Sequence, residues 1–180
     1  WPLGNNPRGK YYAAVPGSAR IANADFPLWK VVRASTAAPS FFDPERLTIA
    51  TGADKKTVDG TFVDGGVSPF NNPSLQAVMY ATLAGHGVNW ATGADRLLLV
   101  SVGTGTSSPA TSGSHIAAKG AIRALVSLMN DCGSLVETMM QWMSESPTAR
   151  TIDRQIGTLE GDLIGGVPLL SYLRYNLMLA

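Results

Sequence analysis

Cysteine and histidine are scarce in this chain, and their scarcity excludes two classes of protein. A single cysteine, Cys132, cannot build an internal disulfide framework, and it fits a reducing compartment. The two histidines, His86 and His115, lie far apart, with no cysteine or acid beside them at the spacing of metal ligands. The sequence therefore predicts neither a disulfide-stapled domain nor a metal centre, and we expect no cofactor.

Charged residues are also few, at 15% of the 180 residues, and 14 basic residues nearly balance 13 acidic ones. Such a chain has no excess of positive charge that would attract nucleic acid, so we expect a neutral or apolar partner. The longest uncharged run, 97–118, is rich in Gly, Ser, Thr and Pro after Val102, so it is not a membrane span. We recognise no signal peptide, and we expect a location in the cytoplasm or in peripheral contact with a membrane.

Turn-forming residues rather than a helix or strand open the chain, which begins WPLGNNP at Trp1. We interpret the sequence as a piece of a longer protein. Its length is that of one ordinary domain, and nothing in the composition indicates a second domain.

Two Asp-Gly pairs, Asp59-Gly60 and Asp64-Gly65, compete for one turn. The first lies between apolar and β-branched residues, which is the strongest short signal for a two-residue hairpin turn. Residues 61–63 then form a buried return strand, and Asp64 falls at its exit. Because catalytic groups in open α/β sheets gather at the carboxyl ends of strands, Asp64 is the candidate for chemistry. Gly65 and Gly66 have no Cβ, so they permit positive φ and close approach of another backbone.

Helix and strand patterns alternate along the chain, which is the signature of an α/β sandwich. The run LLLVSV at 97–102 is apolar on both faces, as expected of a central strand covered by helices on each side. Residues 122–143 have a helical period and predict one long helix or two broken near Gly133. Two further helices are expected: one at 26–35, with Asp25 as its N-cap and Pro39 beyond its end, and one from the Asn72-Pro73 cap to about His86. The buried face of the second helix would be Leu75, Val78, Met79 and Leu83. The expected strands are 11–15, the hairpin arms 47–50 and 57–64, and the segments 151–156 and 172–179.

Three runs of residues carry a resemblance to a known family. They are LWKVVRASTAAPSFF at 28–42, FVDGGVSPFNNP at 62–73 and LVSVGTG at 99–105. In order and spacing they resemble the patatin-like phospholipase family, and YLRYN at 172–176 with the early NNP resembles its bacterial members. The resemblance implies a three-layer α/β sandwich with a largely parallel sheet. Residues 1–180 would be the C-terminal portion of a single patatin-like domain, without its N-terminal strands and nucleophile elbow.

In that family a serine and aspartate dyad hydrolyses acyl esters of lipids without a histidine. Its Asp-Gly-Gly motif maps onto Asp64-Gly65-Gly66, which implies that Asp64 is the base. The serine belongs to a GxSxG elbow, and no serine of this chain has glycine at both flanking positions. The resemblance therefore implies that the nucleophile and the oxyanion loop lie upstream of Trp1, and it predicts that this segment alone is inactive.

Ester hydrolysis through a serine places requirements on the aspartate that takes the hydroxyl proton. An aspartate, with a reference pKa of about 3.9, matches a serine hydroxyl poorly, so it must be fixed within hydrogen-bond reach and shielded from water. Two other functions remain open at this stage: a catalytically incomplete module that binds lipid or a partner, and a nucleotide-binding domain built on Gly103-Thr104-Gly105. The latter has no third glycine and no Walker lysine, so a tight turn is the simpler interpretation.

Substrate-binding residues and oligomeric state are not predicted. Four methionines gather near Trp142, and we interpret this stripe as core, with an acyl-chain or membrane contact as the alternative. The stripe consists of Met129, Met139, Met140 and Met143.

Overall fold

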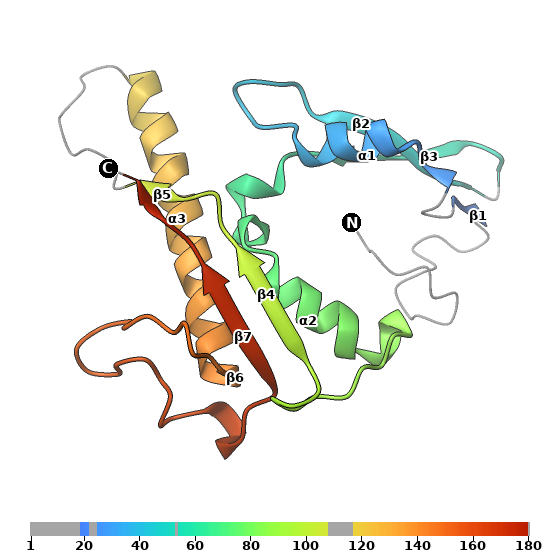
Figure 1. The fold of residues 1–180 in the computed structure, drawn as a ribbon. Coiled ribbons are helices and arrows are strands. Elements are labelled where there is room, and N and C mark those ends of the chain that lie inside the picture. The colour runs from blue at the N-terminus through green and yellow to red at the C-terminus, as the bar shows by residue number, and fades with distance from the viewer. Residues whose placement is uncertain (1–18, 22–24, 53, 108–116, 180) are drawn as a thin grey trace. The chain divides into compact units, whose positions relative to one another are not determined.

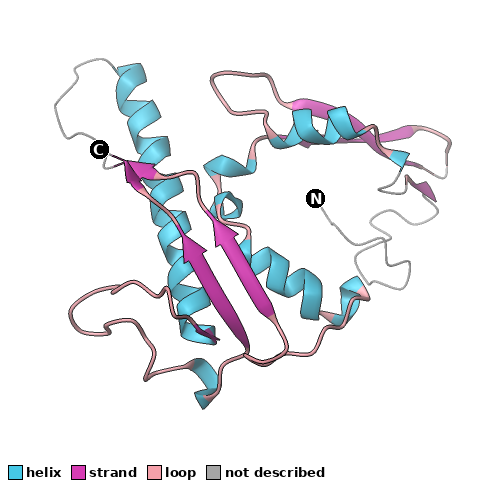
Figure 2. Cartoon of the chain, in the orientation of Figure 1, coloured by secondary structure: helices cyan, strands magenta, loops and turns pink. Residues whose placement is uncertain are grey.

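The computed structural model describes residues 19–21, 25–52, 54–107 and 117–179. The described residues form both helices and strands (Figure 2). The chain divides into two compact units, the first made of residues 1–66 and 80–89 and the second of residues 67–79 and 90–180. The strand predicted at 11–15 lies outside the described residues.

A three-stranded antiparallel sheet forms the centre of the first unit. Its strands are β1 (Ala19–Arg20), β2 (Glu45–Thr51) and β3 (Thr57–Phe62), in the order β1-β2-β3. Helix α1 (Leu28–Ser35) packs against β2, as Figure 1 shows. The buried apolar residues of this unit are small apart from one leucine: Ala34, Ala37, Leu47, Ala50 and Ala81.

The predicted hairpin arms are confirmed, but the prediction of a turn at Asp59-Gly60 is wrong. Both residues lie within β3, where they pair with Thr48 and Leu47 of β2. The Asp59 carboxylate accepts a hydrogen bond from the Thr48 hydroxyl at 2.8 Å. A β-bulge shifts the register between Thr48 and Ala50. The cross-strand pairing therefore decides where the turn falls, and the dipeptide alone does not.

The chain instead reverses between Gly52 and Lys56. The Gly52 N–H donates to the Lys56 carbonyl at 2.7 Å, and Lys55 adopts a left-handed φ of 64°. Asp54 accepts the Lys56 backbone N–H at 3.1 Å, which is an Asx turn. This bond and the nearby Lys56 ammonium group lower the pKa of Asp54.

Helix α1 begins later than predicted, and Asp25 is not its N-cap. Pro27 occupies that position without a side-chain cap, and its carbonyl accepts the N–H groups of Lys30 and Val31. Proline fits a helix start because its φ, here −58°, is already close to the helical value. The helix ends at Ser35, before Pro39, as the sequence predicts.

A parallel sheet forms the centre of the second unit, with the strand order β4-β7-β6. The strands are β4 (Leu98–Val102), β6 (Ser144–Glu145) and β7 (Leu170–Tyr175), and the short strands β5 (Thr106–Ser107) and β8 (Met178–Leu179) make a further parallel pair. Helix α3 (Ala117–Met143) runs unbroken through Gly133, so one long helix is confirmed. Together with helix α2 (Ser74–Thr82), these elements confirm the α/β class.

Helices α2 and α3 contribute to the same core cluster on one face of this sheet. Its buried members are Leu97, Val136, Met140, Leu170 and Tyr172, with Leu75 and Val78 packed against them. Met140 is 0% exposed, which confirms the core interpretation for that methionine, whereas Trp142 is largely exposed. Of the predicted buried face of α2, Met79 is exposed, and Leu83 lies beyond the helix and is also exposed.

The prediction that 97–102 is a central strand covered on both faces is wrong for the described residues. Strand β4 lies at the edge of its sheet. Leu98, Val100 and Val102, which share one face, are 61%, 50% and 75% exposed. An apolar run shows that both faces suit burial, but it does not show that a covering element is present.

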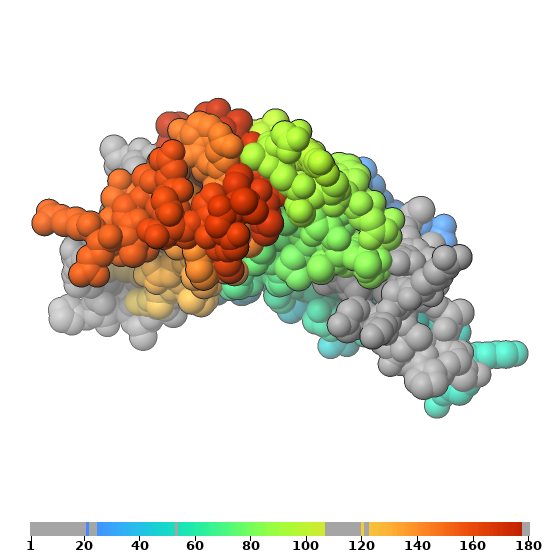
Figure 3. All heavy atoms as spheres, turned by 90° about the horizontal axis from the view of Figure 1, so that it is seen from below, coloured from blue at the N-terminus to red at the C-terminus, as the bar shows by residue number. Residues whose placement is uncertain are grey.

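Residues 146–168 form a long loop that contains a 3₁₀ turn at Ile164–Gly166, and the prediction of a strand at 151–156 is wrong. Figure 3 shows this loop, in orange, at the surface of the second unit. The buried Gln141 side chain anchors it by donating to the carbonyls of Arg150 and Thr158 at 2.9 and 3.2 Å. The strand predicted at 172–179 divides into β7 and β8. No described helix is both long enough and apolar enough to cross a membrane.

Candidate functional site

Asp64 lies two residues beyond the end of β3, in the first unit. Its backbone N–H donates to the carbonyl of Ala37 at 3.0 Å, and Ala37 is fully buried. Its carboxylate oxygen Oδ1 accepts the N–H of Gly66 at 2.7 Å. Backbone and side chain are therefore both fixed, and the position at a strand exit is confirmed.

The surroundings of Asp64 differ from the prediction in two respects. The preceding strand is antiparallel and only half-buried, with Val63 largely exposed, so the rule for parallel sheets does not apply to it. Gly65 and Gly66 begin a 3₁₀ turn without adopting positive φ. The turn uses the backbone N–H of Gly66, which donates to the Asp64 carboxylate.

This arrangement leaves one carboxylate oxygen available. Among the residues that the structure describes, none donates a hydrogen bond to Asp64 Oδ2. A carboxylate held through Oδ1 has few orientations, so a proton donor placed at Oδ2 would meet it in a fixed geometry. The geometry is therefore compatible with a general base.

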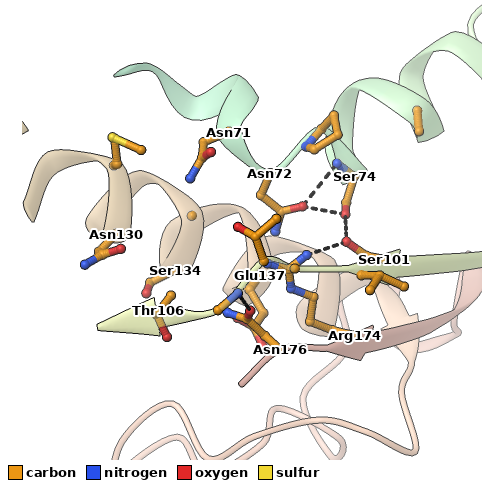
Figure 4. Close-up of a pocket in the computed structure, with 18 of the residues that line it drawn as sticks. Asn71, Asn72, Ser74, Ser101, Thr106, Asn130, Ser134, Glu137, Arg174 and Asn176 are labelled. Atoms are coloured by element: carbon orange, nitrogen blue, oxygen red, sulfur yellow. Dashed lines mark hydrogen bonds between the residues drawn. The ribbon is translucent and has the colours of Figure 1, made fainter. Parts of the chain in front are cut away.

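A polar cavity of about 530 Å³ lies in the second unit, at the carboxyl ends of the parallel strands β4 and β7 (Figure 4). The start of α2 and one side of α3 complete its wall. Its polar lining includes Asn72, Ser74, Ser101, Glu137, Arg174 and Asn176. We refer to it below as the polar cavity.

A chain of hydrogen bonds runs along one wall of the polar cavity. Arg174 Nη1 donates to the Ser101 hydroxyl at 2.7 Å, and the hydroxyls of Ser101 and Ser74 lie 3.0 Å apart. The Ser74 hydroxyl donates to Asn72 Oδ1 at 2.6 Å, and that oxygen also accepts the Ser74 N–H at 3.3 Å. Asn72 therefore caps α2, as the sequence predicts.

The loop between β4 and β5 is held at the same edge. Gly105 has a positive φ of 100°, and its N–H donates to Asn176 Oδ1 at 2.9 Å. The Gly103 N–H donates to the carbonyl of Tyr175 at 2.8 Å. A Cβ at position 103 would overlap Asn176 Oδ1 and lie 2.7 Å from Arg174 Nη2. These contacts support a tight turn at Gly103-Thr104-Gly105.

Replacing Gly103 with alanine should therefore destabilise the protein. The added methyl must displace Asn176 from its bond to Gly105, and overpacking of this kind costs about 1–3 kcal/mol of unfolding free energy. Urea unfolding measures the change. Gly133→Ala is the matched control, because nothing lies within 4 Å of its added Cβ and alanine favours a helix by about 1 kcal/mol. Equal effects at both positions would contradict the packing described here.

One carboxylate reaches the polar cavity, and it is paired. Glu137 Oε2 lies 3.2 Å from Arg150 Nε, and its side chain is mostly buried. The described residues contain no group of three or more His, Cys, Asp or Glu side chains that could hold a metal ion.

Sequence reasoning missed the polar cavity although it noted several of its parts. Asn72 was predicted as a helix cap and Arg174 as part of a resemblance, but neither as part of a site. The available signal was a charged residue inside the apolar run LLSYLRYNL. Such a residue must find a polar partner on its own face of the sheet.

Part of the chain is similar to a known plant protein. No family model matches the chain. It is 34% identical over 96 residues to "Probable inactive patatin-like protein 9" of Arabidopsis thaliana, an alignment that covers 53% of this chain. The chain spans about a quarter of the length of that relative, 24%. The likeness therefore supports a relationship to the patatin-like proteins and no narrower group among them.

Proposed function

We propose that the protein is a patatin-like lipid acyl hydrolase in which Asp64 is the general base. The observation that carries the proposal is the fixation of Asp64, whose N–H is bound to Ala37 and whose Oδ1 is bound to Gly66. The likeness to a patatin-like protein supports it. Residues 1–180 would then be the C-terminal portion of a single domain of bacterial type.

The reaction needs a serine, which a segment of the parent protein outside these residues would supply. Asp64 Oδ2 would take the hydroxyl proton as the serine oxygen attacks the ester carbonyl, and return it to the leaving alcohol. Water would then hydrolyse the acyl-serine by the same proton path. Backbone donors for the oxyanion, from the same upstream segment, would complete the site.

The substrate in this proposal is a phospholipid or another lipid ester. The low charge of the chain and the exposed apolar side chains of β4 suit an apolar ligand. We propose a location in the cytoplasm or in peripheral contact with a membrane. The nucleotide-binding alternative gains no support from Gly103-Thr104-Gly105, which the Asn176 side chain holds as a turn.

A catalytically incomplete module that binds lipid or a partner is the second candidate. One observation favours it: the relative carries the word inactive in its name. In that case the fixed Asp64 turn would serve the fold alone.

Labelling with a fluorophosphonate separates the two candidates. In the full-length protein we expect one serine to react covalently, because an activated hydroxyl attacks the phosphorus, while the 180-residue segment stays unlabelled. Peptide mass spectrometry identifies the site. A full-length protein that remains unlabelled would refute the hydrolase and favour the binding module.

A further inference from the structure

The polar cavity contains hydrogen-bond donors without acceptors. The Ser74 hydroxyl gives its proton to Asn72 Oδ1, so the proton between the two serines belongs to Ser101, and Ser101 accepts from Arg174. Each oxygen along this chain therefore accepts at least one hydrogen bond. Two donors are left over in the described structure, Asn72 Nδ2 at one end and Arg174 Nε at the other, and both are buried.

Arg174 also has an unbalanced charge. Among the described residues no carboxylate lies within ion-pair distance of its guanidinium group, and Glu137 of the cavity wall is paired with Arg150. Asn72, which carries the other free donor, is only 2% exposed. Buried donors without a partner are rare and costly, and a partly buried cation without a carboxylate partner attracts an anion. What the wall lacks is thus a hydrogen-bond acceptor.

We propose that the polar cavity binds a phosphate-type oxyanion through Arg174 and Asn72. Figure 4 shows Asn72, Ser101 and Arg174 directed toward one another from the start of α2, from β4 and from β7. Donors that converge from three elements suit a tetrahedral anion, whereas a planar carboxylate is best met by the two-pronged face of an arginine. Arg174 cannot offer its whole face, because Nη1 is bound to Ser101.

The position in the fold agrees with this ligand. Ligands of parallel sheets bind beyond the carboxyl ends of the strands, where Ser101 and Arg174 lie. The positive end of the α2 dipole lies at Asn72 and adds to the attraction for an anion. Neither free nitrogen is reached by solvent, so binding as proposed requires the Asn72 amide and the guanidinium group to turn toward the cavity when the anion binds.

The test is a calorimetric titration of the full-length protein with inorganic phosphate, against sodium chloride at equal ionic strength. We expect saturable binding to one site. Arg174→Met keeps an unbranched apolar stem and removes the guanidinium group with its charge, so it should weaken binding at least about tenfold. Arg96→Met is the control, because Arg96 is exposed and does not line the cavity, and its phosphate binding should be unchanged.

Asn72→Asp keeps the test decisive if Arg174→Met fails to fold. The aspartate still caps α2 through its acceptor oxygen, but it replaces the free donor with a negative charge that pairs with Arg174. Phosphate binding should be lost while the melting temperature holds or rises. Absence of binding by the wild type, or binding that survives in Asn72→Asp, would overturn the proposal.

Vesicle flotation distinguishes the source of the phosphate. Retention on vesicles of phosphatidylcholine with phosphatidic acid, lost on vesicles of phosphatidylcholine alone and in Asn72→Asp, would identify a lipid headgroup. Phosphate binding without such retention would identify a small soluble phosphate. The site does not involve Asp64, so its failure leaves the proposed hydrolysis untouched, and loss of hydrolysis leaves phosphate binding intact.

Discussion

Replacing Asp64 with asparagine in the full-length protein should lower kcat for ester hydrolysis by about 10²–10⁴-fold, the range that general acid–base catalysis supplies. Asparagine keeps the oxygen that accepts the Gly66 N–H, so the turn should remain folded. What it loses is the carboxylate oxygen that can take a proton. Hydrolysis of a chromogenic acyl ester measures kcat, and the melting temperature checks the fold.

Asp59→Asn is the matched control for this experiment. It makes the same chemical change in the other Asp-Gly pair, within a strand of the same sheet, where the side chain bonds only to Thr48 in the described structure. Its kcat should stay within about twofold of the wild type, because surface changes of this kind alter little. Equal losses in both variants would mean that Asp64 acts through the fold and not through proton transfer.

Replacing Met140 with alanine should produce the largest loss of stability, about 2–5 kcal/mol of unfolding free energy. Met140 is 0% exposed and joins α3 to Leu170 and Tyr172 of the sheet. The alanine would lose those contacts and leave a cavity in the core cluster. Such a loss is a large share of the about 5–15 kcal/mol that holds a domain together.

Met79→Ala provides the comparison, because Met79 lies on α2 and is 43% exposed. Alanine also favours a helix, so the change should stay within about 0.5 kcal/mol. Urea unfolding of both variants gives the two values. If Met140→Ala were as mild as Met79→Ala, the described packing of α3 on the sheet would be incorrect.

Local patterns predicted well those elements that local forces determine. The long helix over 122–143 followed from the spacing of its apolar residues, and the Asn72-Pro73 cap followed from hydrogen bonds within three residues. The position of Asp64 at a strand exit was also correct, although the turn at Asp59-Gly60 from which it was argued was not. Each of these depends on neighbours within a turn or two of the chain.

Predictions failed for features that depend on residues far apart in the sequence. The choice between the two Asp-Gly pairs depended on the pairing of Asp59 with Thr48 and on a bulge in β2. The exposed face of β4 depended on which elements cover it, and an apolar run carries no information about that. Ser101 and Arg174 lie 73 positions apart, and only the parallel register of β4 and β7 brings them together. The polar cavity is a product of this topology.

The rate of fluorophosphonate labelling reports directly on whether Asp64 activates a serine. We expect the full-length wild type to be labelled on one serine and Asp64→Asn to slow the labelling about 10²-fold or more. A serine that reacts equally fast in the wild type and in Asp64→Asn would contradict this expectation, because the base would then be another group.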